Sequence, residues 1–437
     1  MFSHKKSPAP YCIIMVQETR ESEVMDLDIK RLQTTLEQLN EYGNEGQGIN
    51  RLAYTEEEQE AKNFFMELCK KEGMSVRLDT AGNIIARREG QDPSLPAVAF
   101  GSHIDTVYEG GKYDGAVGVV AALEVIRSLN DKKIKTAHPL EIISFACEES
   151  ARFGYSTIGS KAMTGLLSGD YENLRDKDGV YLKEELSKYS LNLEEAKRPK
   201  EELEVFFEIH IEQGPALEET GKKIGIVTGI AAPTRFKLLV KGLASHSGTT
   251  PMKYRKDALL GASEIALALE EQAMEEEQYD TVATVGVCDV KPGAMNIVPG
   301  LVEMKVDIRG VSEESKARVI EKLQSAVEKA EAKRGLEITS TVLAEETPVQ
   351  LEERVIDSLK ETADKLGHSY LLMPSGAGHD AMNMAHLCPT GMLFIPSKDG
   401  LSHNPQEYSS IEDIGIGAEL LEEEIMKWAK VVKEAER

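Results

Sequence analysis

The run Gly-Ser-His-Ile-Asp-Thr-Val at residues 101–107 constrains the fold of this chain more than any other feature. A short apolar segment, residues 97–100, precedes it and predicts a strand that runs into His103. The pair Glu148-Glu149 and the residue His210 each follow another apolar segment. Ligands collect at the carboxyl ends of strands in an α/β sheet, so we expect these side chains to share one edge.

Predicted strands and helices alternate along the first half of the chain, which is typical of an α/β layered sheet. The predicted elements are helices at 29–39, 55–71 and 117–129, and strands at 97–100, 140–146 and 205–209. The same pattern resumes near the C-terminus, with helices at 354–366 and 411–434 and a strand at 392–395.

The stretch between these two parts has its own order of elements, β-α-β-β-α-β, which predicts a ferredoxin-like unit. Its expected strands are 236–240, 281–290, 301–309 and 337–343, and its expected helices are 257–271 and 314–334. Along 301–309, apolar and charged residues alternate, so helices should cover one face of this sheet and leave the other polar.

We therefore predict a larger domain of layered α/β class, discontinuous in sequence, with an inserted ferredoxin-like domain. The larger domain should comprise residues 27–228 and 344–437, and the inserted domain residues 229–343. Residues 1–26 are expected to be a disordered or non-native extension, because the periodic pattern begins only at Leu27.

Composition narrows the function. The net charge of -24 argues against a nucleic-acid partner, because phosphate binding needs a basic surface. No apolar run approaches the roughly 18 residues that span a bilayer, so we expect no membrane segment. The 5 cysteines are odd in number and lack paired metal-ligand spacing, which favours a reducing, cytoplasmic compartment.

The residues at the predicted strand ends suit a hydrolytic metal site, which needs neutral imidazoles, anionic oxygens and a carboxylate that can bridge two ions. His103 offers a nitrogen, and Asp105 can orient its ring. Asp114, which precedes Gly115 in a loop, can bridge two metal ions. Glu149 can be a terminal ligand, which leaves Glu148 as the general base.

Each of these features also has an ordinary explanation. A lone histidine after a strand is usually a hydrogen-bonded structural residue, an Asp-Gly pair is usually a turn, and a pair of glutamates is usually solvated. Together they favour a metal site, because unpaired charges at the ends of buried strands are costly.

Nine sequence blocks occur in a characteristic order. They are Gly-Ser-His-Ile-Asp-Thr-Val (101–107), Gly-Gly-Lys-Tyr-Asp-Gly (110–115), Glu-Glu-Ser-Ala-Arg-Phe (148–153), Glu-Ile-His-Ile-Glu-Gln-Gly-Pro (208–215), His-Ser-Gly-Thr-Thr-Pro-Met (246–252), Asn-Ile-Val-Pro-Gly (296–300), Asp-Ile-Arg (307–309), Ser-Gly-Ala-Gly-His-Asp-Ala (375–381) and Asp-Gly-Leu-Ser-His-Asn-Pro (399–405). With them, the chain resembles the M20 metallopeptidase superfamily from about Met25 to its end. Within that superfamily it looks like the amidase branch of N-carbamoyl-L-amino-acid hydrolases, β-ureidopropionases and allantoate amidohydrolases.

The resemblance implies two divalent metal ions per subunit, which in the family are zinc, manganese, cobalt or nickel. It implies His103, Asp114 and His210 around one ion and Asp114, Glu149 and His403 around the other, with Glu148 as general base. Two departures, Cys147 and Ser150 on either side of the glutamate pair, remove no ligand but can shift the turn.

The resemblance also implies that the larger domain is a metal-binding catalytic domain, that the inserted ferredoxin-like domain is its lid and dimerisation domain, and that residues of both bind the substrate. Gln213 would bind a ureido group, Asn296 and Arg309 would form a binding pair on the lid, and Gly378 and His379 would provide a further carboxylate contact. His246 would stabilise the oxyanion across the interface of a homodimer. From the residues alone, an arginine on this polar face is normally a solvated side chain, although the planar fork of Arg309 fits a carboxylate.

These observations predict a cytoplasmic, homodimeric amidohydrolase that cleaves the carbamoyl C–N bond of N-carbamoyl-L-amino acids to give the L-amino acid, carbon dioxide and ammonia. The alternatives are an allantoate amidohydrolase, an N-acyl-amino-acid hydrolase or dipeptidase, and a catalytically inactive member that only binds metal. The Gln213 block argues against the peptidases, and the full set of ligands argues against an inactive protein.

Overall fold

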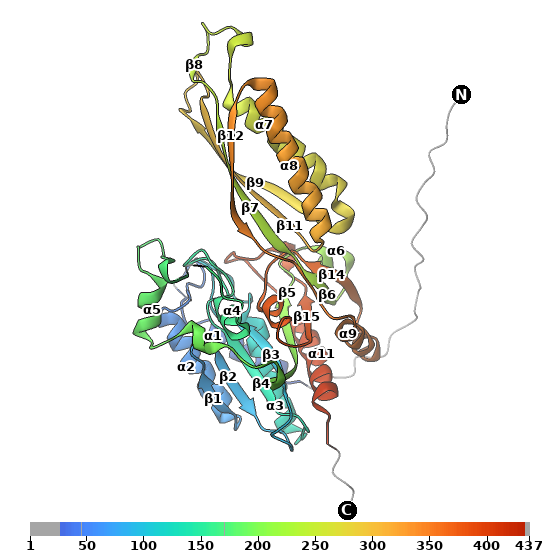
Figure 1. The fold of residues 1–437 in the computed structure, drawn as a ribbon. Coiled ribbons are helices and arrows are strands. Elements are labelled where there is room, and N and C mark those ends of the chain that lie inside the picture. Colours follow the sequence, from blue (N-terminus) through green and yellow to red (C-terminus); the bar gives the residue numbers. More distant parts are fainter. Residues whose placement is uncertain (1–26, 45, 170, 433–437) are drawn as a thin grey trace, which may run out of the picture.

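The computed structural model describes residues 27–44, 46–169 and 171–432. The predicted N-terminal extension, 1–26, lies outside these ranges, and so do positions 433–434 of the predicted terminal helix. Within the described ranges that helix ends earlier than predicted, at Ala429. Two β-sheets organise the chain, the larger in the lower half of Figure 1 and the smaller in the upper half. Within the described ranges, no helix is both long enough and apolar enough to cross a membrane.

The larger sheet has nine strands and mixes parallel and antiparallel pairs. Its strands are β1 (Ser75–Leu78), β2 (Ile84–Arg88), β3 (Ala97–His103), β4 (Leu140–Phe145), β5 (Leu203–Ile211), β6 (Ile224–Ile230), β13 (Val349–Gln350), β14 (Tyr370–Ser375) and β15 (Thr390–Ile395). The strand order is β1-β2-β4-β3-β5-β15-β6-β13, and β14 pairs with β6. The four central strands, β4, β3, β5 and β15, are mutually parallel, so their carboxyl ends meet at one edge.

Helices pack on both faces of this sheet, which makes it the middle of three layers (Figure 1). The helices on one face are α1 (Ile29–Leu39), α2 (Glu56–Lys71), α3 (Ala116–Asp131), α9 (Glu353–Leu366) and α11 (Ile411–Ala429). The other face carries α4 (Ile158–Thr164), α6 (Ala216–Thr220) and α10 (Asp380–Met384), and α5 (Leu182–Lys188) packs in a separate small core. Alternate residues of β3 enter the two cores, Val98 and Phe100 on one side and Ala97 and Ala99 on the other. This period of two explains why the central strands are apolar throughout.

The predicted strand ends need two corrections. Strand β3 continues to His103 rather than stopping at Phe100, and β5 continues to Ile211, so His210 lies inside a strand. The reason is pairing: His210 lies opposite Phe394 of β15 in a parallel ladder that extends to Ile211 and Ile395. Hydrogen bonding to a neighbouring strand, rather than local apolarity, sets where these strands stop.

The smaller sheet confirms the predicted ferredoxin-like unit. Its strands are β7 (Ala232–Lys241), β9 (Val282–Lys291), β11 (Leu301–Gly310) and β12 (Glu337–Glu345), in the order β12-β7-β11-β9 with every pair antiparallel. Helices α7 (Ala258–Glu275) and α8 (Glu313–Arg334) cover one face. Along β11, the apolar side chains from Val302 to Ile308 are buried, and they alternate with the polar ones, as predicted.

A two-stranded ribbon, β8 (Ser245–His246) with β10 (Ile297–Val298), extends from the end of the smaller sheet that is farthest from the larger sheet (Figure 1). At the opposite end, only two short connections join the sheets, β6 to β7 and β12 to β13. The exact domain limits, 27–228 with 344–437 and 229–343, remain a prediction; β6 itself runs to Ile230.

Candidate metal centre

The carboxyl edge of the four central parallel strands gathers the predicted ligands. His103 is the last residue of β3, Glu148 and Glu149 follow β4, and His210 lies one residue before the end of β5. His403 follows β15. Because the four strands are parallel neighbours, side chains separated by up to 300 positions in sequence meet above one edge of the sheet.

Asp114 occupies the turn between β3 and α3, where local backbone geometry holds it beside His103. The next residue, Gly115, has φ of 62°, and a Cβ atom there would lie 2.4 Å from the His103 imidazole. Only glycine can therefore follow Asp114 without displacing the ring.

One carboxylate oxygen of Asp114 faces the first predicted ligand group. Asp114 Oδ1 lies 3.4 Å from His103 Nε2 and 3.2 Å from His210 Nε2. Both rings are buried, and each donates its Nδ1 hydrogen to a main-chain oxygen, that of Asp105 at 3.0 Å and that of Ile211 at 2.9 Å. A carbonyl oxygen can only accept, so each Nδ1 carries a proton, and Nε2 is the nitrogen that can bind a metal when the ring is neutral.

The other oxygen of Asp114 faces the second group. Asp114 Oδ2 lies 3.5 Å from His403 Nε2, which in turn lies 3.3 Å from Glu149 Oε1. In each group of three residues, one ligand atom per residue can be chosen so that all lie within 4.8 Å of one another. Asp114 is therefore shared between the groups through different oxygens, which is the arrangement of a bridging carboxylate.

The donor set fits a divalent transition metal. Ligand atoms about 2.1 Å from a tetrahedral ion are about 3.4 Å apart, close to the separations found here. Burial alone would lower the pKa of His103, yet the carboxylates of Glu148, Asp114 and Asp105 raise it well above its ordinary value. Such a concentration of buried negative charge calls for a cation, and a metal ion would supply it by displacing protons.

Asp105 has a different contact from the one predicted. The ring of His103 donates to the main-chain oxygen of Asp105, whereas the nearest oxygen of its carboxylate lies 3.6 Å away. That carboxylate instead accepts from the backbone amides of Glu148 at 3.2 Å and Glu149 at 3.0 Å. Asp105 thus orients the turn that carries both glutamates.

Glu148 belongs to neither ligand group. Its Oε2 lies 3.7 Å from His103 Nε2, and the side chain is buried at the rim of the first group. Burial raises the pKa of Glu148 well above its usual range; His103 opposes this effect and the charge on Glu149 adds to it. Cys147, beside it, is fully buried, and burial raises the pKa of its thiol, in line with an inert structural cysteine.

Three predicted substrate residues lie near the metal ligands. The ring of His379 is buried, 4.6 Å from that of His210, and follows Gly378 in the loop after β14. The amide of Gln213 donates to Asp114 Oδ2 at 2.7 Å. Gln213 therefore contacts Asp114, one of the predicted metal ligands, directly.

The predicted pair on the lid is not brought together. Arg309 lies at the base of β11, where it pairs with Asp307 at 3.0 Å and reaches Gly376 O at 3.5 Å. His246 ends β8 and Asn296 directly precedes β10, in the ribbon region at the opposite end of the small sheet (Figure 1). The Nδ1 of His246 accepts from the backbone amides of Gly248 and Thr249, and its exposed ring contacts no predicted ligand.

Comparison with known proteins decides the family. The sequence profile described as Peptidase family M20/M25/M40 matches residues 99–427. The chain belongs to this family.

Three curated relatives place it further within the M20 family. An N-carbamoyl-L-amino acid amidohydrolase of Geobacillus stearothermophilus is 39% identical over 90% of this chain and 96% of the relative. A ureidoglycolate hydrolase of Arabidopsis thaliana is 37% identical over 91% and 86%. An allantoate deiminase of the same plant is 33% identical over 78% and 71%.

The fold agrees with that of solved M20 relatives. The crystal structure of an amidase of the hydantoinase/carbamoylase family from Burkholderia multivorans superposes with a TM-score of 0.87 at 34% identity, and covers 93% of this chain and 98% of that one. The predicted family, fold class and metal-dependent hydrolysis of amide C–N bonds are thereby confirmed for this M20 member.

Sequence reasoning missed two polar residues of the M20 site, Ser402 and Glu407. The hydroxyl of Ser402 donates to Asp114 Oδ2 at 2.8 Å, and Glu407 Oε1 accepts from the backbone amide of Asp114 at 3.0 Å. Ser402 stands beside the predicted ligand His403, but nothing in the local pattern marks Glu407, which is almost fully buried in an irregular segment.

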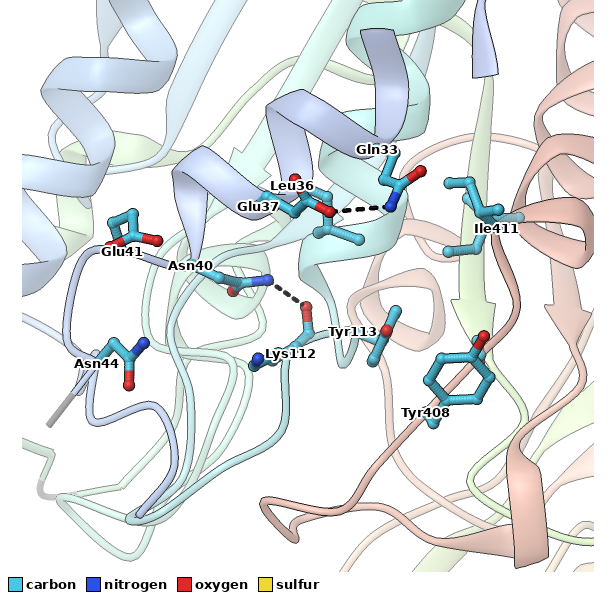
Figure 2. Close-up of a pocket in the computed structure, with 12 residues that line it drawn as sticks. Gln33, Leu36, Glu37, Asn40, Glu41, Asn44, Lys112, Tyr113, Tyr408 and Ile411 are labelled. Atoms are coloured by element: carbon cyan, nitrogen blue, oxygen red, sulfur yellow. Dashed lines mark hydrogen bonds between the residues drawn. The ribbon is translucent and has the colours of Figure 1, made fainter. Parts of the chain in front are cut away.

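A pocket of about 240 Å³ lies beside the metal centre, between α1, the turn before Asp114 and the segment before α11. Figure 2 shows Tyr113 and Tyr408 at its wall, with ring centroids 5.7 Å apart. None of the predicted site residues lines it, so it is a neighbour of the metal centre and not part of it.

Proposed function

We propose that this M20 protein hydrolyses the carbamoyl C–N bond of N-carbamoyl-L-amino acids and uses two divalent ions per subunit, of zinc, manganese, cobalt or nickel. The observation that carries the proposal is that Asp114 is shared between the two ligand groups. One of its carboxylate oxygens faces His103 and His210, and the other faces His403. The family relationship and the name of the Geobacillus stearothermophilus relative supply the substrate class.

Metal ions bound there would polarise the substrate carbonyl and bring the pKa of water to about 7. Glu148 then accepts a proton from the attacking water on its free carboxylate oxygen and returns it to the amino-acid nitrogen as the C–N bond breaks. The other product, carbamic acid, decays to carbon dioxide and ammonia. A buried carboxyl with a raised pKa suits both halves of this transfer.

The rest of the site would bind the substrate. Arg309 carries a planar guanidinium at the base of the lid, and its contact with the Gly376 carbonyl puts it beside the loop that holds Gly378 and His379. We assign the substrate carboxylate to this corner. Gln213, beside Asp114, would contact the ureido group.

We propose further that the protein is a homodimer in which His246 acts on the partner's site. Because Nδ1 of His246 accepts two amide hydrogens, the ring proton belongs on Nε2, an exposed donor suited to an oxyanion. The exposed residues Leu260, Leu267 and Met274 recur every seven positions along α7 and form an apolar stripe that a second copy can cover. Asn296 directly precedes Ile297, which pairs with His246, and would enter the same partner site.

Mixing variants tests the dimer. His246→Ala and Glu148→Gln proteins should each be inactive, and a refolded mixture should regain about a quarter of wild-type turnover, because half the dimers are mixed and each mixed dimer has one intact site. Failure to regain activity, with dimers present by light scattering, would place His246 in its own subunit's site, and an active His246→Ala protein would place it outside any site.

A cytoplasmic location is part of the same proposal. Among the described residues, Cys69, Cys147, Cys288 and Cys388 are free thiols, which suits a reducing compartment.

The substrate test compares N-carbamoyl-L-methionine, allantoate and ureidoglycolate by ammonia release from manganese-loaded protein, with acetate release from N-acetyl-L-methionine as the control. Preference for the carbamoyl compound supports the proposal. Preference for either of the other two ureido acids favours the activity named for the Arabidopsis thaliana relatives. Cleavage of the acetyl compound alone refutes the ureido assignment of Gln213.

A further inference from the structure

Two chain segments meet behind Asp114, and their contact joins ligands that are far apart in the sequence. One is the turn before α3, which carries Asp114. The other is the irregular segment between β15 and α11, which carries His403. Each of these residues belongs to the second ligand group, together with Glu149.

Glu407 fixes the backbone of the first segment. It is only 3% exposed, and its Oε1 accepts from the amides of Tyr113 at 2.8 Å and Asp114 at 3.0 Å. The fit is tight, because a Cβ atom on Gly111 would lie 2.2 Å from the same oxygen. These two amides precede the first turn of α3, so the Glu407 carboxylate determines where that turn starts and where the Asp114 side chain leaves it.

Ser402 fixes the carboxylate of Asp114. Its Oγ lies 2.8 Å from Asp114 Oδ2 and 3.1 Å from Glu407 Oε2. A hydroxyl has one proton, and the shorter contact assigns it to Asp114. Since Ser402 directly precedes His403, the same few residues hold the imidazole and the carboxylate oxygen that it faces at 3.5 Å.

We propose that Ser402 and Glu407 are positioning residues that preform the second ligand group by fixing Asp114 relative to His403. The first group depends on them less, because His103 and His210 are set by strands β3 and β5 and by their own carbonyl contacts. This inference rests on the proposed two-ion centre. It predicts that binding of the second ion depends specifically on Ser402 and Glu407, which touch neither the substrate nor the reacting atoms.

The test is Mn²⁺ binding to chelator-treated full-length protein, followed by calorimetry and by loss of the free-ion signal in electron paramagnetic resonance. The disruptive variants are Ser402→Ala and Glu407→Ala. Ser402→Thr keeps the hydroxyl, and Glu407→Gln keeps an oxygen that can accept both amides. The disruptive variants should weaken the second binding step by about 10–100-fold and leave the first nearly unchanged, while the conservative ones should restore it.

Two matched controls separate positioning from general stability. Ser409→Ala removes a buried hydroxyl of the same segment, which donates to Pro396 O at 2.7 Å. Glu422→Ala removes a buried carboxylate that accepts from Ser128 Oγ, also at 2.7 Å, away from the metal centre. Each control should lower the melting temperature without changing either binding step.

The outcomes are distinct. Unchanged Mn²⁺ binding in Ser402→Ala overturns the inference, and so does an equal loss of both steps, which would indicate a merely structural role. Ser402→Ala keeps the test decisive if Glu407→Ala does not fold. A wild-type protein that binds fewer than two ions would refute the two-ion centre, and the inference with it.

Discussion

Replacing Glu148 by glutamine separates proton transfer from metal binding, because the structure puts this carboxylate outside both ligand groups. Its Oε2 lies 3.7 Å from His103 Nε2, and its backbone is held by Asp105, which the substitution leaves in place. A positioned general base contributes about 10²- to 10⁴-fold to the rate, which corresponds to about 2.7–5.4 kcal/mol. Turnover should fall by that factor while metal content stays the same.

Stability should change in the opposite direction from activity. In the chelated protein, the raised pKa of Glu148 means that the fold disfavours the ionised form, so the carboxylate costs stability once the pH exceeds its unfolded pKa of about 4.5. The amide removes this cost. The melting temperature of chelated Glu148→Gln at pH 7 should therefore equal or exceed that of the chelated wild type.

The assay measures kcat, bound metal by mass spectrometry and melting temperature on the same samples, with Glu149→Gln as the matched control. Glu149 follows in the same turn but faces His403 at 3.3 Å, so its substitution should lose bound metal as well as activity. Loss of metal from Glu148→Gln would make Glu148 a ligand, and wild-type turnover would remove it from the reaction. Either result refutes the assignment.

Three further substitutions test neighbouring parts of the structure. Arg309→Ala should raise KM for carboxylated substrates by about 10- to 100-fold with little change in kcat, because one charge-assisted contact is worth about 1.5–3 kcal/mol. An unchanged KM in steady-state kinetics would contradict this. Asp105→Ala leaves two buried backbone amides without acceptors and should destabilise the chelated protein by at least about 1–3 kcal/mol in urea unfolding, whereas unaltered stability would contradict the capping role. Glu264 pairs with Arg334 and Lys333, which lower its pKa to about 2, so its contribution is present above pH 4.5 and lost as the pH falls through about 2. Because the group is partly exposed to solvent, Glu264→Gln should cost at most about 1 kcal/mol at pH 7 and nothing well below pH 2, and a difference that persisted there would exclude the ion pair as its cause.

The metal ligands could be predicted because their signal is local. An apolar segment that ends in a histidine or in paired acids reveals both a strand and its polar end, and parallel pairing then brings such ends together without further information. His103 and the pair Glu148-Glu149 follow this logic. His403 does not, because its loop has no periodic pattern, and only the resemblance to the M20 family identified it.

The supporting contacts could not be predicted, because they depend on pairs of residues separated by most of the chain. Glu407 meets the Asp114 amide across 293 positions, and Ser402 meets the Asp114 carboxylate across 288. The carboxylate contact of Asp105 is of the same kind, since it reaches a turn more than 40 positions away. The short strands β1 and β2 were also missed, because their charged residues hide the apolar pattern and pairing alone defines them.

Arg309 and His246 lie at opposite ends of the small sheet, which limits how both residues can serve one catalytic site. From Leu301, next to the ribbon, to Arg309 the strand β11 spans about 27 Å at about 3.4 Å per residue, and a paired strand cannot bend to bring its ends together. If Arg309 binds the carboxylate in its own subunit, His246 must reach the reaction from the partner. At substrate concentrations well below KM, mixtures of Arg309→Ala with Glu148→Gln should then regain no wild-type site, because each site of a mixed dimer carries one of the two lesions, whereas His246→Ala with Glu148→Gln regains turnover. Recovery in both mixtures would instead put Arg309 on the partner's site together with His246.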